Sequence, residues 1–271
     1  MPANSLTAFD TLAADYDHSF SQSLTGNSQR MQSRKWLSAF LEGKAELNIL
    51  EINCGTGDDA LWLASLGNKV VATDLSRAMI EEAKRKQVLY SSPLPLNFMQ
   101  CDFNDLHAQL KDKKFDLIFS NFSGLNCISP NKIELLNNHF YNFLKPGAHI
   151  AVVIFGKYNL WEMSWYGLQF KFGKAFRRLN KNSSIMKLKD GFTQPVYYYS
   201  ISRFRRLMNQ FTLLEKKPVG LFIPPSYLEN FIRKRPRFFH FLEKMEKKAG
   251  GIPAFTRFAD HSYLLLKKKE R

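Results

Sequence analysis

Short apolar runs alternate with longer amphipathic stretches along the first 155 residues of the chain. The apolar runs predict five strands, at residues 47–52, 69–74, 96–103, 115–122 and 148–155. The amphipathic stretches predict helices before and between them, at residues 28–41, 58–67, 76–90 and 131–144. In the second of these helices we expect Leu61, Ala64 and Leu66 to form the buried face. Strands that alternate with helices indicate a parallel sheet joined by right-handed crossovers.

After residue 155 the regular alternation stops. The pattern predicts one further helix at residues 200–211 and two further strands at residues 212–222 and 261–267. We therefore predict an α/β, Rossmann-like fold with a seven-stranded, mostly parallel sheet, helices on both faces, and helical, aromatic insertions that form a lid. The predicted division of the chain is a helical cap at residues 1–45, a Rossmann-like core at 46–155, a basic aromatic insertion at 156–199, the completion of the core sheet at 200–223 and 260–271, and a second basic insertion at 224–259.

The composition is typical of a globular protein. Hydrophobic residues make up 45% and aromatic residues 14% of the 271 positions, enough for a sizeable core. The three cysteines are odd in number and lack CxxC spacing, so we predict neither a disulfide framework nor a metal site. The chain does not open with a basic start and an apolar run, and its apolar runs are too short to span a bilayer. We therefore expect a cytoplasmic location.

Positive charge is concentrated in the second half of the chain. The net charge is +15, but residues 1–150 carry 14 Lys and Arg against 16 Asp and Glu, whereas residues 151–271 carry 25 against 8. The two predicted insertions carry 8 basic against 2 acidic residues and 8 against 3. Their aromatic residues include Trp161, Trp165, Tyr166, Phe170, Phe172, Phe176, Phe231, Phe238, Phe239 and Phe241. This mixture suits a hydrophobic ligand with an anionic group, or access from an anionic membrane surface; a solvated basic surface is the alternative.

Glycines and acidic residues follow the first three predicted strands. Gly55 and Gly57 stand at a strand-to-helix turn, where glycine lets the backbone approach a ligand closely. Asp74 ends the next strand 17 positions after Gly57, where a carboxylate can accept both ribose hydroxyls. Asp102 ends the third strand and is followed by Phe103, a flat partner for an adenine ring. The arrangement predicts a site for an adenosyl ligand.

A nicotinamide cofactor is the competing interpretation of these glycines. Its fingerprint is GxGxxG, whereas this turn reads GTGDDA, with Asp58 and Asp59 at the start of the helix. Two carboxylates at that position would repel a pyrophosphate, so the sequence favours a cofactor without phosphate.

The turn and its acidic partners resemble those of the class I S-adenosylmethionine-dependent methyltransferases. The family pattern ExGxGxG is matched by Glu51, Asn53, Gly55 and Gly57, with Asn53 in place of the first glycine. Asparagine tolerates left-handed backbone geometry better than most residues, so we expect the turn to survive. The resemblance covers about residues 45–155, including the step LKPGAHIAVVIF into the fifth strand.

The resemblance implies S-adenosylmethionine as cofactor, S-adenosylhomocysteine as product, and a role for each matching residue. Glu51 and the turn would hold the methionine portion, Asp74 and the adjacent Leu75 would hold the ribose, and Asp102 with Phe103 would hold the adenine. Asn121 and Phe122, just past the fourth strand, would face the methionine end. Tyr16 and Asp17 resemble an N-terminal Tyr-Asp pair of many members, where the leading helix closes over the cofactor.

His261 is the predicted catalytic base. In the family the seventh strand is antiparallel, so its first residues lie at the sheet edge where ligands bind. Asp260 and His261 begin that strand here, which makes Asp260 an orienting partner of the base. Methyl transfer needs a general base only for poorly ionised nucleophiles, because positioning contributes most of the catalysis. A structural or capping role is the alternative for both residues.

The resulting functional prediction is a methyltransferase that acts by in-line transfer on a small-molecule or lipid-like, anionic acceptor. A contact with an anionic membrane surface would place the protein at the periphery of the membrane. One alternative is an RNA methyltransferase, since the basic half would also attract phosphates. The fourth strand ends in SNFSGLN, without the Asn/Asp-Pro-Pro-aromatic signature of many base methylases. A non-catalytic module that binds S-adenosylmethionine is a further alternative.

Overall fold

A seven-stranded sheet forms the centre of the molecule. The computed structural model describes residues 9–122, 124–180, 183–188 and 191–270. The strand order is β3-β2-β1-β4-β5-β9-β8, and β9 runs antiparallel to both of its neighbours while the first five strands are parallel. The strands are β1 (Asn48–Ile52), β2 (Lys69–Asp74), β3 (Leu96–Gln100), β4 (Phe115–Ser120), β5 (Leu144–Phe155), β8 (Phe211–Val219) and β9 (His261–Lys268). The predicted α/β fold with a mostly parallel seven-stranded sheet is confirmed.

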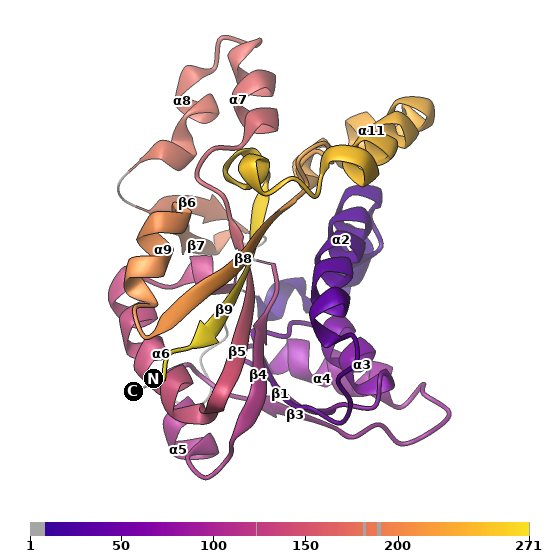
Figure 1. Ribbon diagram of the computed structural model, residues 1–271. Helices are drawn as coiled ribbons and strands as arrows, with labels where there is room; N and C mark the ends of the chain where they lie inside the picture. The colour runs from indigo at the N-terminus through magenta and orange to yellow at the C-terminus, as the bar shows by residue number, and fades with distance from the viewer. Residues whose placement is uncertain (1–8, 123, 181–182, 189–190, 271) are drawn as a thin grey trace.

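Helices cover both faces of the sheet (Figure 1). One face packs against α5 (Leu106–Leu110), α6 (Pro130–Phe143) and α9 (Ile201–Leu207), through buried side chains such as Phe140 and Phe204. The other face packs against α2 (Leu24–Leu41), α3 (Asp58–Ser65) and α4 (Arg77–Gln87), through residues such as Leu37 and Leu63. Two separate apolar layers therefore sandwich the sheet, as is usual when parallel strands are connected by helices.

The helix bounds differ from the predicted ones where caps decide them. Helix α2 begins four residues earlier than predicted, because the hydroxyl of Ser23 accepts a hydrogen bond from the N–H of Gly26. Helix α3 ends at Ser65, so Leu66 lies outside it and is exposed; the prediction that Leu66 is buried is wrong. Leu61 and Ala64 are buried as predicted.

Most of the remaining elements lie outside the sheet. The N-terminal strap is residues 9–23, and contains η1 (Asp10–Leu12), α1 (Ala13–Tyr16) and the π-helical turn η2 (Asp17–Ser21). A short turn, η3 (Gly124–Cys127), follows β4. The segment after β5, residues 156–199, contains α7 (Leu160–Gly167), α8 (Phe172–Ala175), η4 (Arg177–Leu179) and the hairpin β6 (Ser184–Lys187) with β7 (Thr193–Val196). The segment after β8, residues 224–259, contains η6 (Ser226–Leu228), α10 (Glu229–Arg233), α11 (Pro236–Ala249) and η7 (Pro253–Phe258).

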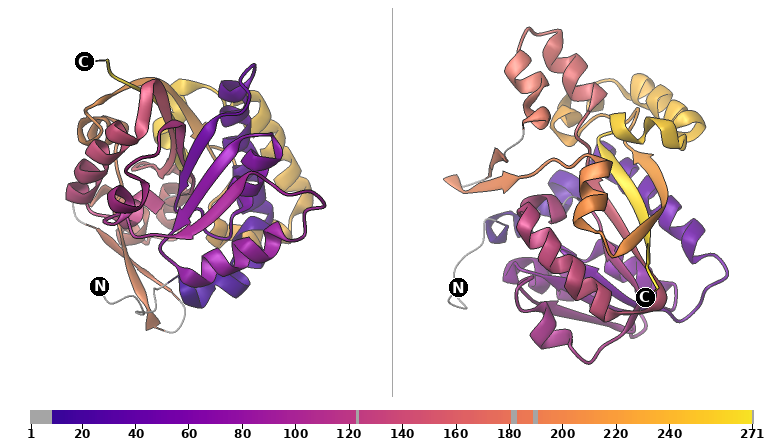
Figure 2. Two further views of the ribbon diagram at one scale, coloured as in Figure 1. Left: turned by 90° about the horizontal axis from the view of Figure 1, so that it is seen from below. Right: turned by 60° about the vertical axis from the view of Figure 1, so that its left-hand side comes forward.

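We predicted a helical insertion at residues 156–199, but this segment also contains a hairpin. Its hairpin extends away from the main sheet (Figure 2) and pairs antiparallel from Ser184 with Val196 to Lys187 with Thr193. Strands of four residues are too short to give a readable alternation of apolar and polar positions. Within the described residues, no helix is both long and apolar enough to cross a bilayer.

Candidate active site

The carboxyl ends of the parallel strands and the first residue of β9 meet at one edge of the sheet. His261 is the register partner of Phe155, the last residue of β5, and of Val219, the last residue of β8. The turn after β1 and the loops after β2, β3 and β4 leave the sheet at the same edge, because these strands are parallel. The topology thus gathers the predicted cofactor residues and the predicted base at one edge.

Asn53 supports the turn after β1. Its φ of 49° lies in the left-handed region, as do the φ angles of 55° at Gly55 and 80° at Gly57. The Asn53 side-chain amide donates to the carbonyl of Asn121 at 2.9 Å, and its oxygen accepts from the hydroxyl of Ser120 at 2.7 Å. A glycine would allow the same backbone but could not bond to the end of β4. Asn53 therefore fastens the turn to the neighbouring strand.

Asp74 lies directly beside the turn. Its carboxylate accepts hydrogen bonds from the N–H of Gly55 at 2.8 Å and from the N–H of Ser76 at 2.9 Å. Burial raises the pKa of Asp74 above its usual range, although these two N–H donors oppose the rise. The adjacent Leu75 is exposed. One carboxylate thus shapes the turn and keeps further lone pairs for a ligand.

Asp102 and Phe103 lie in the loop after β3. A carboxylate oxygen of Asp102 accepts from the N–H of Asn104 at 2.8 Å, which fixes the side chain at the start of the loop. Phe103 is half-buried and packs against the apolar layer that α5 and α6 share with the sheet. These two residues follow β3 at the same sheet edge as Asp74.

Glu51 carries a buried carboxylate oxygen without a partner. The residue is 2% exposed, and its Oε2 has no hydrogen bond to any described residue. Burial raises the pKa of Glu51 well above its usual range, and nearby Asp59 adds to the rise while Arg30 opposes it. An unpaired buried carboxylate oxygen is costly, and it suits the ammonium group of the methionine portion of S-adenosylmethionine. On this test the residues present fit the cofactor that the sequence implied.

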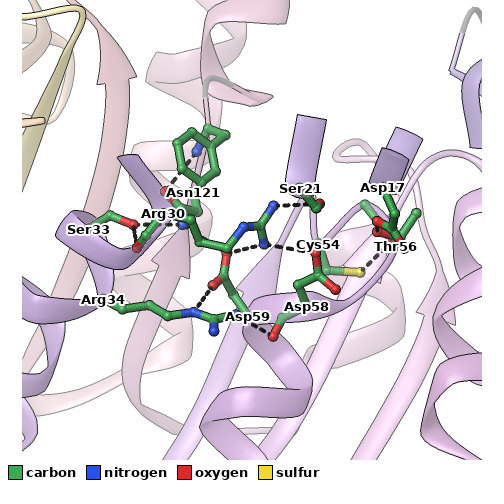
Figure 3. A network of polar contacts seen from close by, with 12 residues as sticks. Asp17, Ser21, Arg30, Ser33, Arg34, Cys54, Thr56, Asp58, Asp59 and Asn121 are labelled. Atoms are coloured by element: carbon green, nitrogen blue, oxygen red, sulfur yellow. Dashed lines mark hydrogen bonds and ion pairs between the residues drawn. The ribbon is translucent and has the colours of Figure 1, made fainter. Parts of the chain in front are cut away.

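A buried network of charges ties α2 to the start of α3 (Figure 3). The Arg30 guanidinium lies 3.0 Å from Asp59 and 3.4 Å from Asp58, and Arg34 bonds to Asp59 at 2.7 Å. The amide of Asn121 donates to the same Asp59 carboxylate at 2.8 Å. Arg30 and Lys86 outweigh the effect of burial and lower the pKa of Asp58. Since both carboxylates are paired with cations, their charge argues less strongly against a pyrophosphate than the sequence suggested.

The N-terminal strap covers the cofactor turn. A Cβ placed on Gly55 would lie 3.9 Å from Cε1 of Tyr16, so the tyrosine ring lies directly over the turn. Asp17 accepts from the hydroxyl of Thr56 at 2.5 Å and pairs with Lys86 at 2.8 Å. Burial raises the pKa of Tyr16 to about 12. The structure thus brings the predicted Tyr-Asp pair into contact with the turn.

His261 is buried between aromatic rings. It stacks on Phe155 at a centroid distance of 4.5 Å and meets the edge of Phe122 at 5.6 Å. Its Nδ1 lies 3.4 Å from the Asp260 carboxylate and has no hydrogen bond to the described residues. Burial lowers the pKa of His261 to about 4, despite the opposing charge of Asp260. The imidazole is therefore neutral at pH 7.

Asp260 is a hub for three segments rather than a dedicated partner of His261. Its carboxylate accepts from Arg178 at 2.7 Å, from Asn159 at 2.6 Å and from Gln29 at 3.2 Å. Burial alone would raise the pKa of Asp260, but His261 and Arg178 hold it below the usual range. The expected orienting hydrogen bond to His261 is absent among the described contacts, although Nδ1 lies 3.4 Å from the carboxylate.

Phe122 connects the cofactor side of the site with His261. Its ring contacts Phe20 of the N-terminal strap at 5.0 Å, and the Arg30 guanidinium lies 5.2 Å from its centre. The residue has a φ of 45°, which an aromatic residue rarely adopts. Strained backbone at such a position is common where a ligand is bound.

Sequence reasoning missed Arg30 and Arg178, the two buried arginines of this region. The spacing of Arg30 and Arg34 by four residues on an amphipathic helix was the available signal for the first. For Arg178 the sequence offers only an Arg-Arg pair after an aromatic run, with no sign that Glu162 and Asp260 would surround it. No group of three or more His, Cys, Asp or Glu in the described ranges is arranged to hold a metal ion.

Comparison with known proteins shows which domain and which relatives the chain is similar to. Residues 49–147 match the family model described as a methyltransferase domain. The chain is 29% identical over 242 residues to malonyl-[acyl-carrier protein] O-methyltransferase 1 of Ilyobacter polytropus, a match that covers 86% of the chain and 84% of that enzyme. It is 30% identical over 159 residues to the demethylmenaquinone methyltransferase of Clavibacter sepedonicus, which covers 57% of the chain and 59% of the relative.

Solved structures show the same architecture. A methyltransferase structure from Methanosarcina mazei superposes with a TM-score of 0.60 at 16% identity, over 86% of this chain and 98% of that one. Magnesium protoporphyrin IX methyltransferase from Synechocystis, solved with bound S-adenosylhomocysteine, gives a TM-score of 0.57 at 15% identity over 89% and 84% of the two chains. At these identities the structures support the fold, while the matched sequence pattern supports the cofactor. Residues 49–147 are therefore a methyltransferase domain. The chain has the fold of the class I S-adenosylmethionine-dependent methyltransferases and is similar in sequence to members of that family.

Proposed function

We propose that this methyltransferase acts on a small, lipid-like acceptor that carries an anionic group and is reached from an anionic membrane surface. The observation that carries the proposal is the pair of aromatic, basic segments, residues 156–199 and 224–259, that adjoin the sheet edge of His261. In this proposal the two segments form a lid over the acceptor, residues 1–45 cap the cofactor, and residues 46–155, 200–223 and 260–271 make up the core.

The cofactor residues have distinct proposed roles. When bound, S-adenosylmethionine supplies a methyl group on a positively charged sulfur. Glu51 holds the ammonium group, and Asn53, Gly55 and Gly57 shape the turn around the methionine portion. The remaining contacts extend along the cofactor: Asp74 and Leu75 at the ribose, Asp102 and Phe103 at the adenine, Tyr16 above the turn, and Asn121 with Phe122 at the methionine end.

The apolar character of the acceptor is supported by aromatic contacts between the two segments. Trp165 meets Phe231 edge to face at 5.0 Å, and Tyr166 stacks near Tyr227 at 5.8 Å. Trp161 packs against the small apolar cluster that includes Phe239 and Leu242. These contacts join both segments into one aromatic body beside the site, which suits an apolar acceptor better than a polar one.

The anionic group of the acceptor is supported by the burial of acidic residues in the second half of the chain, residues 151–271. Glu162 is buried and paired with Arg177 and Arg178. Glu246 is buried and accepts from the backbone N–H groups of residues 221–223. With these carboxylates internal, the exposed surface of the half keeps a strong excess of positive charge. The acceptors named in the two relatives, malonyl-[acyl-carrier protein] and demethylmenaquinone, further support a small-molecule or lipid-like acceptor.

Methyl transfer to such acceptors tests the proposal. Purified protein with radiolabelled S-adenosylmethionine is expected to label long-chain acyl or isoprenoid compounds that carry a carboxylate or phosphate, and to label their neutral methyl esters at least tenfold more slowly. Total RNA is the control acceptor. Labelling of RNA that weakens steeply with salt would point to the RNA alternative instead. Cofactor binding without transfer to either class would point to a non-catalytic module.

His261 is the proposed base for an acceptor whose nucleophile is protonated. We expect His261→Gln to lower kcat about 100-fold with such an acceptor, which is typical of the loss of a general base. Since the neutral imidazole is the active form and its pKa is about 4, wild-type kcat/KM should stay flat from about pH 8 to 5 and fall only as the pH approaches 4. A fall of kcat/KM centred at about pH 6.5, the ordinary pKa of an exposed histidine, would contradict this role. An acceptor that is already ionised is the control, because its rate should not depend on His261.

A further inference from the structure

The turn between α7 and α8 exposes a group of apolar side chains. Leu168, Phe170 and Phe172 are 82%, 80% and 56% exposed, and Phe176 is exposed as well. Residues 163–180 contain no acidic residue, and Lys171 and Lys174 stand among the apolar positions. Residues 168–176 are named the α7–α8 tip below. In Figure 1 the tip lies at the end of the molecule farthest from the sheet. Large apolar side chains exposed together mark a binding surface more often than scattered ones do.

The backbone of the tip is strained in a way that displays Phe170. The N–H of Lys171 donates to the carbonyl of Tyr166, and the N–H of Phe170 donates to the carbonyl of Gly167, both at 2.9 Å. This pair of bonds is the Schellman motif that ends α7, and it puts Phe170 at the left-handed position that glycine usually occupies. Its φ is 56°. An aromatic residue therefore holds a strained position while most of its ring faces solvent, which neither packing nor the turn requires.

A second basic and aromatic surface lies at the same end of the molecule. It comprises α10, the start of α11 and the residues that join them. Phe238 and Phe241 are exposed there. The neighbouring cations are Arg233, Lys234, Arg235 and Arg237, all of them exposed. The Trp165 and Phe231 rings connect this surface to α7, so the α7–α8 tip and the second surface belong to one packed body.

We propose that the α7–α8 tip inserts into the interface of an anionic lipid bilayer, with the basic surface of α10 and α11 lying against the headgroups. Aromatic and aliphatic side chains beside lysines are the combination that binds peripheral proteins to such interfaces. The tip is a projecting turn rather than a groove, so it suits a soft interface that closes around it. The inference rests on the proposed function, since a lipid-like acceptor would be met at that surface.

Vesicle binding with matched variants tests the inference. Without cofactor or acceptor, the protein should cosediment with vesicles of phosphatidylcholine and phosphatidylserine at a ratio of about 7:3, and at least tenfold less with phosphatidylcholine alone. Phe170→Gly removes the ring and relieves the backbone strain, so we expect it to keep or raise the thermal stability while lowering vesicle binding about tenfold. Phe172→Ser should lower the binding further.

The control is an apolar pair of equal exposure elsewhere. Val88 and Leu89 are 82% and 77% exposed after α4, near the opposite edge of the sheet, and Val88→Ser with Leu89→Ser should leave vesicle binding unchanged. The inference fails if the wild type does not bind anionic vesicles, or if Phe170→Gly binds them as well as the wild type. It also fails if the α7–α8 tip binds an acidic protein and not the vesicles. Absence of vesicle binding with intact transfer to a detergent-dispersed acceptor would overturn the membrane contact and leave the proposed methyl transfer to a lipid-like acceptor standing. Vesicle binding without any transfer would overturn only that function.

Discussion

Replacing Asp74 with alanine is expected to weaken the binding of S-adenosylmethionine about 100-fold. The carboxylate is proposed to accept both ribose hydroxyls, and each hydrogen bond to a charged group contributes about 1.5–3 kcal/mol. Loss of two such bonds corresponds to a factor of about 100 or more in the dissociation constant. Isothermal titration calorimetry with S-adenosylmethionine and S-adenosylhomocysteine measures the change directly.

Two effects contribute to this loss, and they can be separated. The same carboxylate accepts from the N–H groups of Gly55 and Ser76, so its removal also loosens the turn. A cofactor analogue without ribose hydroxyls cannot make the two bonds to Asp74. Any difference in its affinity between the wild type and Asp74→Ala therefore measures the effect of the substitution on the turn alone. Asp112→Ala, which removes an exposed carboxylate from the loop before β4, is the matched control and should bind normally. Equal affinity of Asp74→Ala and the wild type would refute the proposed cofactor site.

Gly57→Ala is expected to lower the free energy of unfolding by about 2–5 kcal/mol. A Cβ at this position would lie 2.6 Å from Cζ of Phe98 and 2.8 Å from Cβ of Ala83, closer than packed atoms come. Both neighbours belong to the apolar layer beneath α3 and α4. Overpacking of a core costs about 1–3 kcal/mol, and the left-handed φ of 80° adds about 1–2 kcal/mol for any residue with a Cβ.

Gly67 provides the comparison that isolates the steric part. Its φ of 85° is nearly the same as that of Gly57, but a Cβ on Gly67 would have no described atom within 4 Å. Gly67→Ala should therefore cost only the backbone strain, about 1–2 kcal/mol. Urea denaturation followed by circular dichroism gives both values. Equal losses in the two variants would mean that close packing is not what requires glycine at position 57.

The sequence was most informative where one strong pattern decides the structure. The buried parallel strands read as continuous apolar runs, because both of their faces are covered, and the strand from 69 to 74 was predicted at its observed bounds. The turn residues followed from the geometry that glycine and asparagine permit. Leu66 is exposed because helix α3 ends before it, and the strands of the β6–β7 hairpin are only four residues long. The periodicity of apolar residues does not predict where such short elements begin and end.

The polar interior could not be predicted in the same way. The pairing of Arg30 with Asp59 joins residues 29 positions apart, and that of Arg178 with Asp260 joins residues 82 positions apart. Such partners are chosen by the packing of whole elements, so charge counting along the chain cannot reveal them. The depressed pKa of His261 likewise depends on burial between Phe122 and Phe155, although its place at the sheet edge was predicted.

The Asp260 carboxylate has a consequence for how this enzyme can diverge. Arg178 and Asn159 reach it from the segment after β5, and Gln29 reaches it from α2, while its own residue immediately precedes β9. The segment after β5 and helix α2 are thus joined to the start of β9 at one buried carboxylate. Loops distant from that anchor can change length, charge or hydrophobicity without disturbing the geometry around His261. The architecture therefore permits the proposed acceptor-binding segments to vary while the anchor beside His261 stays unchanged.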